Sequence, residues 1–554
     1  MTPPAPRPAR RPARTLTELR GLLAELGSLP AAGMTGQSEA VLPEVVLHGV
    51  THDSRAVQPG DLYAALPGAH VHGARFAAAA AGSGAAAVLT DPAGAALLAG
   101  QVDLPVVTTA SPRPDMALVA DWLYGHPSGA FTLLGVTGTN GKTTSAFLLD
   151  AGLRAAGHRT GLIGTVETRI ADERLDAVRT TPESTDLHAL FAVMAERGVT
   201  AATMEVSSHA LAQHRVDGAR FAGALFTNLS QDHLDYHPTM RDYFEAKARL
   251  FEPGRSAVSV VGTDPAAGEW GPRLAARVPG AITYAPGPPA DWWADDLVTG
   301  PAGSAFTARG PHGLTLPVEV RLPGRFNVVN ALGALALLVA AGIPADAAAA
   351  GIGTLAGVPG RMERVDAGQP FLALVDFAHT PDAVETVLTS VRGLIEGRLI
   401  VVLGCGGDRD RAKRPLMGAA VARLADLAFF TNDNPRSEDP AEILAQMTAG
   451  AGAVATSAAK VTVIQDRSEA IAAAVAEAGP GDAVVVAGKG HERGQEQNGV
   501  VTPFDDRLVL ADALATAIAS RGRAGESRAG SPRPTTSTAG RTDPGAGSGT
   551  EPVR

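Results

Sequence analysis

Hydrophobic positions along the chain fall into two alternating kinds of segment. Short runs rich in Val, Leu, Ile and Phe each end in Gly, Asn or Asp: "FTLLGVTG" (131–138), "GALFTN" (223–228), "GRLIVVLGCGG" (397–407), "LAFFTND" (427–433) and "DAVVVAGKG" (482–490). Between them lie longer Ala- and Leu-rich runs with apolar residues at helical spacing. This alternation predicts α/β domains in which helices cover sheets. Such sheets carry their ligand-binding loops where the strands end, so these five strand ends are candidate sites.

Pro- and Gly-rich stretches mark candidate domain boundaries within this alternation of strands and helices. "TTASPRPD" (108–115) and "LAGVPGRMER" (355–364) interrupt it inside the chain. Residues 1–14 and 521–554 contain almost no large apolar side chains, so they cannot bury enough surface to offset the entropy of ordering. The sequence therefore predicts three α/β domains, at 15–111, 112–357 and 358–520, between two disordered tails.

The composition limits the partners and the cellular location expected for these domains. The 554 residues are 45% hydrophobic, and 57 acidic against 47 basic side chains give a net charge of −10, which argues against nucleic acid as a partner. No apolar run follows the basic N-terminus, so no secretory signal is expected. The apolar stretch from Asn330 is interrupted by Pro344 and Asp346, which favours a buried helix over a membrane span. A single cysteine, Cys405, fits a reducing cytoplasm.

A glycine-rich loop follows the first of these strands. "GVTGTNGKTT" departs from the common G-x-x-x-x-G-K-[ST] form because Val136 stands where the first glycine would be. A helical run ending near Gly157 comes next, so strand, loop and helix are in the order of a phosphate-binding loop. Lys142 would supply a cation to the β- and γ-phosphates of ATP, and Thr143 a hydroxyl to Mg²⁺. The predicted ATP-binding residues of this loop are Gly135, Val136, Thr137, Gly138, Thr139, Asn140, Gly141, Lys142, Thr143 and Thr144.

Further along the chain lie candidate metal ligands and an unusual lysine. "SQDHLDYH" contributes Asp232, His233, Asp235 and His237, and Glu205 would end a strand where its carboxylate could share Mg²⁺ with Thr143. On a helical wheel Lys247 falls within the apolar arc of its helix. Either its ammonium reaches water past the apolar side chains, or burial beside a metal alters its charge or chemistry.

Nine motifs together resemble those of a known family in order and spacing. They are "GVTGTNGKTT", "EVSSHALAQHRV", "TNLSQDHLDYH", "LPGRFNVVNALGALA", "VPGRMERV", "DFAHTPDAVE", "GCGGDRDRAKRPLMG", "TNDNPR" and "AGKGHERGQ". The chain is identified by them as a member of the Mur ligases, the ATP-dependent amide ligases of peptidoglycan synthesis, over about residues 45 to 510. The resemblance implies a UDP-binding first domain, a central ATPase, and a Rossmann-like third domain that receives the incoming amino acid.

The resemblance also assigns catalytic and nucleotide-binding roles. In the family, ATP phosphorylates a substrate carboxylate, and an amine then attacks the acyl phosphate. Lys142, Glu205, His233 and Lys247 would be catalytic, with Lys247 carried as a carbamate (N6-carboxylysine). Thr143, Glu205, His233 and Lys247 would hold Mg²⁺. Asn330 would lie at the adenine, and Arg361 and Asp376 would reach the nucleotide when the domains close.

Substrate specificity is implied in the same way. The motifs are most similar to those of members that add diaminopimelate to UDP-N-acetylmuramoyl-L-alanyl-D-glutamate. The UDP-linked substrate would contact Ser54, Ala69, His70, Val71, Thr180, Thr181, Ser207, Gln213 and Arg215. Diaminopimelate would contact Arg409, Asp433, Asn434, Pro435, Arg436, Gly488 and Glu492. Arg436 can hold the distal carboxylate of diaminopimelate with two parallel hydrogen bonds.

The composition and the family resemblance together predict a cytoplasmic monomer with neither a membrane nor a nucleic-acid partner. Three other functions remain open. A lysine-adding Mur ligase would not need Arg436. A folylpolyglutamate synthetase-like ligase would share the loop and the lysine carbamate but not "DNPR" or the UDP motifs. A P-loop switch protein would hydrolyse nucleotide without an acyl acceptor.

Overall fold

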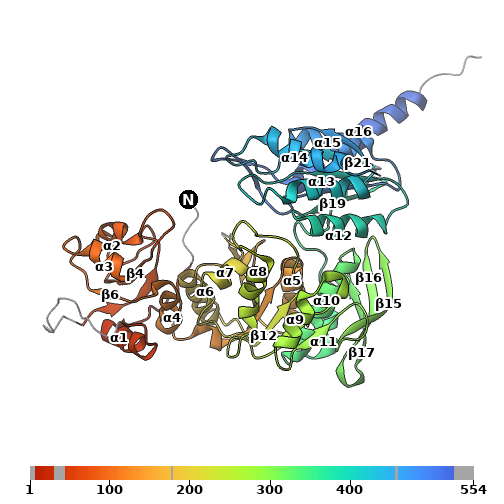
Figure 1. Cartoon of the computed structure of the whole chain (residues 1–554). Coiled ribbons are helices and arrows are strands. Elements are labelled where there is room, and N and C mark those ends of the chain that lie inside the picture. Colours follow the sequence, from red (N-terminus) through yellow and green to blue (C-terminus); the bar gives the residue numbers. More distant parts are fainter. Residues whose placement is uncertain (1–5, 30–43, 176–178, 456–458, 530–554) are drawn as a thin grey trace, which may run out of the picture.

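The computed structural model describes residues 6–29, 44–175, 179–455 and 459–529. Three bodies of sheet and helix follow one another along the chain, with the first and third on opposite sides of the second (Figure 1). Each has its own hydrophobic core, as the alternation of strand and helix patterns predicts.

The first domain is built on a parallel sheet. Its strands lie in the order β3 (Gly49–Thr51), β4 (Asp61–Ala65), β5 (Ala87–Thr90) and β6 (Val106–Thr108). Its helices are α1 (Leu16–Glu25), α2 (Ala77–Gly82), α3 (Pro92–Leu98) and α4 (Pro112–Leu123). Val119 and Leu123 of α4 pack with Leu19 and Leu89 in the core of this sheet. The sequence-based boundary at 111/112 places α4 in the next domain, because Pro112 and Pro114 look like a linker when they begin a helix.

An N-terminal arm lies along the first two domains. Arg7 Nη1 is 2.6 Å from the buried Asp61 carboxylate, and the backbone N–H groups of Ala9 and Arg10 each donate to the Glu196 carboxylate of the central domain at 2.8 Å. The arm then enters β1 (Arg14–Thr15), which pairs antiparallel with β2 (Val46–Leu47). The predicted tail over 1–14 is therefore wrong for residues 6–14, whose contacts are ionic and backbone interactions that hydropathy does not register. Residues 1–5 lie outside the described part of the chain.

The central domain contains a twisted sheet of eight strands. Its order is β10 (Glu173–Leu175), β9 (Thr168–Ile170), β8 (Thr160–Ile163), β11 (Ala201–Glu205), β7 (Thr132–Thr137), β12 (Gly223–Phe226), β13 (Ser259–Gly262) and β14 (Ile282–Tyr284). The six strands from β8 to β14 are parallel, and β9 and β10 are antiparallel. An antiparallel sheet of β15 (Trp293–Gly300), β16 (Gly303–Arg309) and β17 (Thr315–Val320) packs beside it.

Helices cover both faces of the central sheet. They are α5 (Lys142–Ala155), α6 (Ser184–Glu196), α7 (Ser208–Ala212), α8 (Met240–Ala248), α9 (Trp270–Arg277), α10 (Arg325–Ala340) and α11 (Ala345–Thr354). The apolar stretch from Asn330 forms buried parts of α10 and α11, as predicted. Among the helices described, none combines the length and the hydropathy needed to cross a membrane.

The third domain is a doubly wound α/β sheet. Its order is β18 (Glu363–Arg364), β19 (Leu372–Asp376), β23 (Ala483–Ala487), β20 (Leu399–Leu403), β21 (Leu427–Phe430) and β22 (Lys460–Val463), parallel except for β18. Its helices are α12 (Pro381–Arg392), α13 (Lys413–Leu424), α14 (Pro440–Gly452), α15 (Arg467–Glu477) and α16 (Asp506–Ala529), and a hairpin joins β24 (Gly494–Gln497) to β25 (Val500–Pro503). Helix α16 crosses position 521, where the sequence predicts a tail, because Leu510 and Leu514 anchor it on the sheet. Residues 530–554 of that predicted tail are outside the described ranges.

Candidate active site

A single cleft of about 1370 Å³ is lined by the central and C-terminal domains. The strands β7, β11 and β12 end at it from one side, and the loops after β19, β20, β21 and β23 reach it from the other. It therefore brings together most of the residues predicted for ATP, metal and diaminopimelate binding.

The phosphate-binding loop has the geometry that its glycines require. Gly138 and Gly141 have φ angles of +148° and +85°, which L side chains rarely adopt. A Cβ on Gly138 would collide with Thr227, whereas Val136 is an ordinary buried residue of β7. Glycine is therefore needed at 138 and 141 and not at 136, which accounts for the departure from the common loop pattern.

The loop lysine and threonine lie at the start of α5. Lys142 Nζ folds back and donates to Gly138 O at 3.0 Å and Thr139 O at 2.8 Å. Thr143 Oγ1 donates to Glu205 Oε2 at 3.0 Å, and Thr165 Oγ1 reaches the same carboxylate oxygen at 3.1 Å. Hydroxyl and carboxylate oxygens are the donors that Mg²⁺ prefers, so the Thr143 and Glu205 side chains fit a magnesium site.

Lys247 is buried, with 1% of its surface exposed. Its Nζ donates to Gly138 O at 2.7 Å and lies 4.7 Å from the centre of the Tyr243 ring. Burial and the nearby Lys142 ammonium lower the pKa of Lys247 well below its ordinary value. Of the two interpretations left open by the helical wheel, the exposed, water-facing lysine is excluded.

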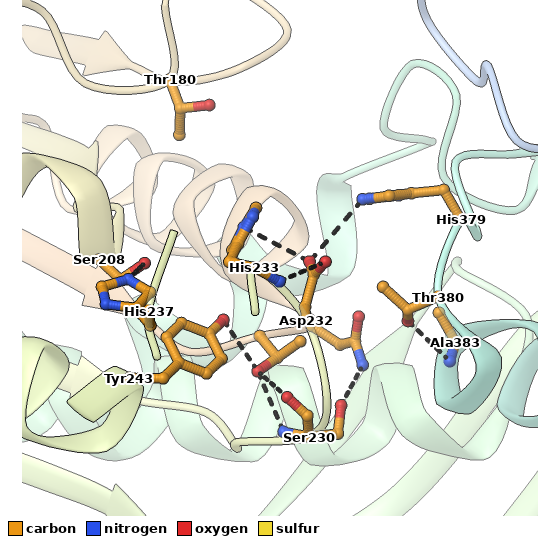
Figure 2. Close-up of polar contacts among 12 residues, drawn as sticks. Thr180, Ser208, Ser230, Asp232, His233, His237, Tyr243, His379, Thr380 and Ala383 are labelled. Carbon is orange, nitrogen blue, oxygen red and sulfur yellow. Dashed lines mark hydrogen bonds and ion pairs between the residues drawn. The ribbon is translucent and has the colours of Figure 1, made fainter. Parts of the chain in front are cut away.

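Asp232 and His233 follow in a loop that Figure 2 shows in close-up. Asp232 Oδ2 lies 3.4 Å from His233 Nε2 and 3.9 Å from Nε2 of His379, which comes from the C-terminal domain. Burial lowers the pKa of His233 to about 3, so this imidazole is neutral at neutral pH and keeps a free lone pair. His237 turns away instead and contacts Ser208 Oγ at 3.0 Å.

The predicted metal ligands do not form a ready-made acidic cluster. No three His, Cys, Asp or Glu side chains within the described ranges group in a way that could hold an ion. As an amine, Lys247 is also a poor Mg²⁺ ligand. A second metal site on His233 and Lys247 fits only if Lys247 carries added oxygens, as a carbamate would.

Arg361 and Asp376 connect the C-terminal domain to the nucleotide loop in different ways. Arg361 Nη2 donates to Thr143 Oγ1 at 3.1 Å and stacks 4.4 Å from the Phe377 ring centre. Asp376 accepts the backbone N–H groups of Met362 at 2.7 Å and Ala378 at 2.8 Å. Burial raises the pKa of Asp376 even though Arg361 opposes the shift. Asp376 therefore holds the turn that carries Arg361.

The loop has two further neighbours. Asn330 on α10 lines the cleft against Gly141, and its Nδ2 donates to Asn327 Oδ1 at 3.1 Å. Asp382 Oδ2, at the start of α12, accepts Asn140 Nδ2 at 2.8 Å and Ser230 Oγ at 3.0 Å. Asp382 and Thr165 were not predicted as site residues. Asp382 lies within the motif "DFAHTPDAVE", but nothing local distinguishes it from a residue that caps a helix.

Six of the seven residues predicted for diaminopimelate line the C-terminal-domain side of the cleft, and Pro435 is not among the lining residues. Asn434 Nδ2 donates to Glu492 Oε2 at 2.8 Å, and the buried Lys489 donates to the same oxygen at 2.9 Å. Arg436, at φ +53°, donates through Nη1 to Gly407 O at 2.7 Å. Arg409, Asp433 and Gly488 also line the cleft. Lys489 is a cation that sequence reasoning missed, although it lies inside the quoted motif "AGKGHERGQ".

Predicted contacts to the UDP-linked substrate divide between two places. Thr180, Thr181, Ser207 and Arg215 line the cleft, and Arg215 Nη2 donates to Gln213 Oε1 at 2.7 Å. Ser54 and the exposed turn Ala69, His70 and Val71 belong to the first domain and are not among the residues that line the cleft.

A phosphate-binding loop facing a polar pocket on a second α/β domain defines a class of enzyme that brings a nucleotide to another substrate between domains. Three family models match consecutive parts of this chain: "Mur ligase family, catalytic domain" over residues 46–121, "Mur ligase middle domain" over 136–338, and "Mur ligase, glutamate ligase domain" over 360–490. The chain belongs to the Mur ligase family.

Individual relatives agree with these matches. A UDP-N-acetylmuramoyl-L-alanyl-D-glutamate–2,6-diaminopimelate ligase of Streptomyces coelicolor is 55% identical over 517 residues, or 92% of this chain and 98% of the relative. A solved structure with the same enzyme name is 32% identical, with a TM-score of 0.61 over 91% of this chain and 99% of that one. A Mycobacterium tuberculosis folylpolyglutamate synthase complexed with ADP shares the fold at 20% identity and a TM-score of 0.55, over 67% of this chain and 91% of that one.

Proposed function

We propose that this chain is an ATP-dependent ligase that joins diaminopimelate to UDP-N-acetylmuramoyl-L-alanyl-D-glutamate. The observation that carries the proposal is the single cleft in which the Lys142 loop faces the group formed by Arg436, Asn434 and Glu492. The relative that is 55% identical over nearly its whole length supports the same activity.

The proposed reaction has two steps. A carboxylate oxygen of the D-glutamyl residue attacks the γ-phosphorus of ATP, the bond to the β-phosphate oxygen breaks, and ADP leaves. The amine of diaminopimelate then attacks the acyl carbon, the carbon–oxygen bond to phosphate breaks, and phosphate and a proton leave. Catalysis of this kind rests mainly on positioning the reactants and on neutralising phosphoryl oxygens.

The central domain would bind the nucleotide. In this proposal the backbone of Gly135 to Thr144 wraps the phosphates, and Lys142 leaves the carbonyls of Gly138 and Thr139 to contact them. Asn330 would bind the adenine. Asp376 would act through Arg361, because it holds the turn that brings this guanidinium to Thr143.

Thr143 and Glu205 would hold a first Mg²⁺, and His233 with a carbamylated Lys247 would hold a second. When bound, Mg²⁺ supplies positive charge against the phosphate oxygens. The carbamate forms when the neutral Nζ of Lys247 attacks the carbon of CO₂ and loses a proton. The lowered pKa of Lys247 favours this step, because only the unprotonated amine is a nucleophile.

The amino acid would be bound at the far end of the cleft. Arg436 and Asn434 would hold the distal carboxylate of diaminopimelate, and Glu492 its distal ammonium. Lysine lacks that carboxylate and would forgo the charge-assisted hydrogen bonds from Arg436, whose side chain is only 21% exposed, so lysine should be rejected. Arg409, Asp433, Pro435 and Gly488 would complete the pocket.

The UDP-linked substrate would extend from the cleft toward the first domain. Thr180, Thr181, Ser207, Gln213 and Arg215 would contact its peptide and sugar end, while Ser54 and the turn at 69–71 would contact the UDP. We further propose a cytoplasmic monomer, and a net charge of −10 supports the absence of a nucleic-acid partner.

One assay tests the proposal. The purified protein is given ATP, Mg²⁺ and the UDP-linked dipeptide, with meso-diaminopimelate, LL-diaminopimelate, L-lysine or a folate plus L-glutamate offered separately. Amide formation with either diaminopimelate isomer, and at most trace product with the others, is expected. ADP release that is indifferent to the carboxylate and amine substrates would favour a nucleotide switch instead.

A further inference from the structure

Lys413 is a buried cation at the first residue of α13. Only 7% of its surface is exposed, and it lines the cleft between the two domains. Among the described residues its ammonium has no hydrogen-bond acceptor and no ion-pair partner within 4.0 Å. Although most of the side chain is covered, the ammonium itself is not sealed from the cleft, so it is free to bind an anion that enters there.

The other lysines in and beside the cleft already have partners. Lys142 and Lys247 donate to backbone carbonyls of the loop, at distances of 2.7 to 3.0 Å. Lys489 donates to Asn434 and Glu492. Lys413 thus differs from its neighbours in keeping all three donors free for a ligand.

The backbone around Lys413 is rigid and electropositive. The next residue, Arg414, is fully buried and donates to Glu438 Oε1 at 2.8 Å and to Gly406 O at 3.2 Å, which fixes the start of the helix. Ala412 provides no side-chain cap, Arg414 donates its backbone N–H to Arg411 O at 3.2 Å, and Pro415 has no N–H, so the start of α13 offers few N–H groups to a ligand. The contribution of the helix is therefore mainly the positive end of its dipole, which adds to the charge of Lys413.

Two groups on which the charge of Lys413 acts, Asp232 and His379, belong to the phosphate end of the cleft, whereas a third, the Cys405 thiol, is also acted on by Asp433. Burial opposes ionisation of Asp232, yet the nearby His233, His379 and Lys413 side chains keep its pKa below the ordinary range. Burial also lowers the pKa of His379 to about 4, and the charge of Lys413 contributes to that shift. Figure 2 shows His379 facing Asp232. Ser230, two residues before Asp232, shares Asp382 with the phosphate-binding loop residue Asn140.

We propose that the Lys413 ammonium binds a phosphoryl oxygen of the group in transfer, from the γ-phosphate of ATP through to the acyl phosphate. The inference rests on the ligase function proposed above. Lys142 would contact the phosphoryl group from the central domain, and Lys413 would contact the same group from the C-terminal domain. Negative charge spread over the phosphoryl oxygens would then be neutralised from both sides of the cleft.

The test compares Lys413→Met and Lys413→Arg with Lys460→Met, a matched change at an exposed lysine of the same domain. Steady-state kinetics give kcat and the KM for each substrate. Rapid-quench measurement of ADP, with the UDP-linked dipeptide present and no amino acid, isolates acyl phosphate formation. Lys413→Met should slow the ADP burst and kcat by about 100-fold, with each of the three KM values changed by less than about threefold. Lys413→Arg should recover part of the loss, and Lys460→Met should match the wild type.

Three results would overturn the inference. One is a normal ADP burst with a raised KM for diaminopimelate, which would make Lys413 a carboxylate ligand of the amino acid. The second is a normal burst together with unchanged kinetics. The third is a thermal midpoint lowered equally in the Met and Arg variants, which would indicate a structural role. A wild-type protein that forms no amide would instead refute the ligase function itself.

Discussion

Arg361 Nη2 lies 3.1 Å from Thr143 Oγ1, although 218 positions separate the two residues in sequence. The contact joins the start of the C-terminal domain to the residue that follows the loop lysine. The Arg361 turn is held in place by Asp376, which accepts the N–H of Met362. Under the proposed function, approach of the two domains would therefore also complete the phosphate site.

Replacing Arg361 by alanine should lower kcat by about 100-fold, because a positioned cation near the phosphates is lost. Arg361→Lys should restore little, since an ammonium cannot both stack on Phe377 and reach Thr143 with a planar fork. Steady-state kinetics with all three substrates provide the measurement. A kcat near the wild-type value in Arg361→Ala would show that the contact is only structural.

Replacing Lys247 by alanine should remove most activity, since both the carbamate and its metal site are lost. Wild-type protein depleted of CO₂ should regain activity when bicarbonate is added, and Lys247→Ala should not respond. Mass spectrometry of the native protein gives an independent readout, as carbamylation adds the mass of CO₂. An active Lys247→Ala protein would contradict the proposed role of this side chain.

Replacing Arg436 by alanine should raise the KM for diaminopimelate by roughly 10- to 150-fold, because a hydrogen bond to a charged group contributes about 1.5–3 kcal/mol. The KM for ATP should stay close to that of the wild type. Arg423→Ala is the matched control, because Arg423 lies on the outside of α13 and pairs with Glu385. An unchanged KM for diaminopimelate in Arg436→Ala would exclude this guanidinium as the carboxylate ligand.

Replacing Glu196 by alanine should release the N-terminal arm from the central domain without lowering kcat. Its carboxylate accepts two backbone hydrogen bonds, each contributing about 0.5–1.5 kcal/mol at most. Limited proteolysis should cut the arm faster in this variant than in the wild type or in Glu25→Ala, a change at an exposed residue of α1. Equal rates of cleavage would mean that the remaining contacts, among them the Arg7–Asp61 ion pair and the β1–β2 pairing, hold the arm without Glu196.

The sequence predicts the site best where chemistry depends on local geometry. Strand ends, loop glycines and the apolar arc around Lys247 are local patterns, and the structure has β7, α5 and the buried lysine where they were expected. Contacts between distant segments leave no such pattern. The packing of α4 on the first sheet, the partners of Asp382 and the isolation of Lys413 emerge only when the domains are assembled.

The hydrogen bonds between the N-terminal arm and Glu196 place little constraint on the amino-acid sequence of the arm. Ala9 and Arg10 meet Glu196 through backbone N–H groups, which every amino acid except proline possesses. Related chains could therefore carry other side chains at these two positions and keep both hydrogen bonds to the central domain. Among related chains, conservation would therefore be expected only at the acceptor, as an acidic residue kept at the end of α6.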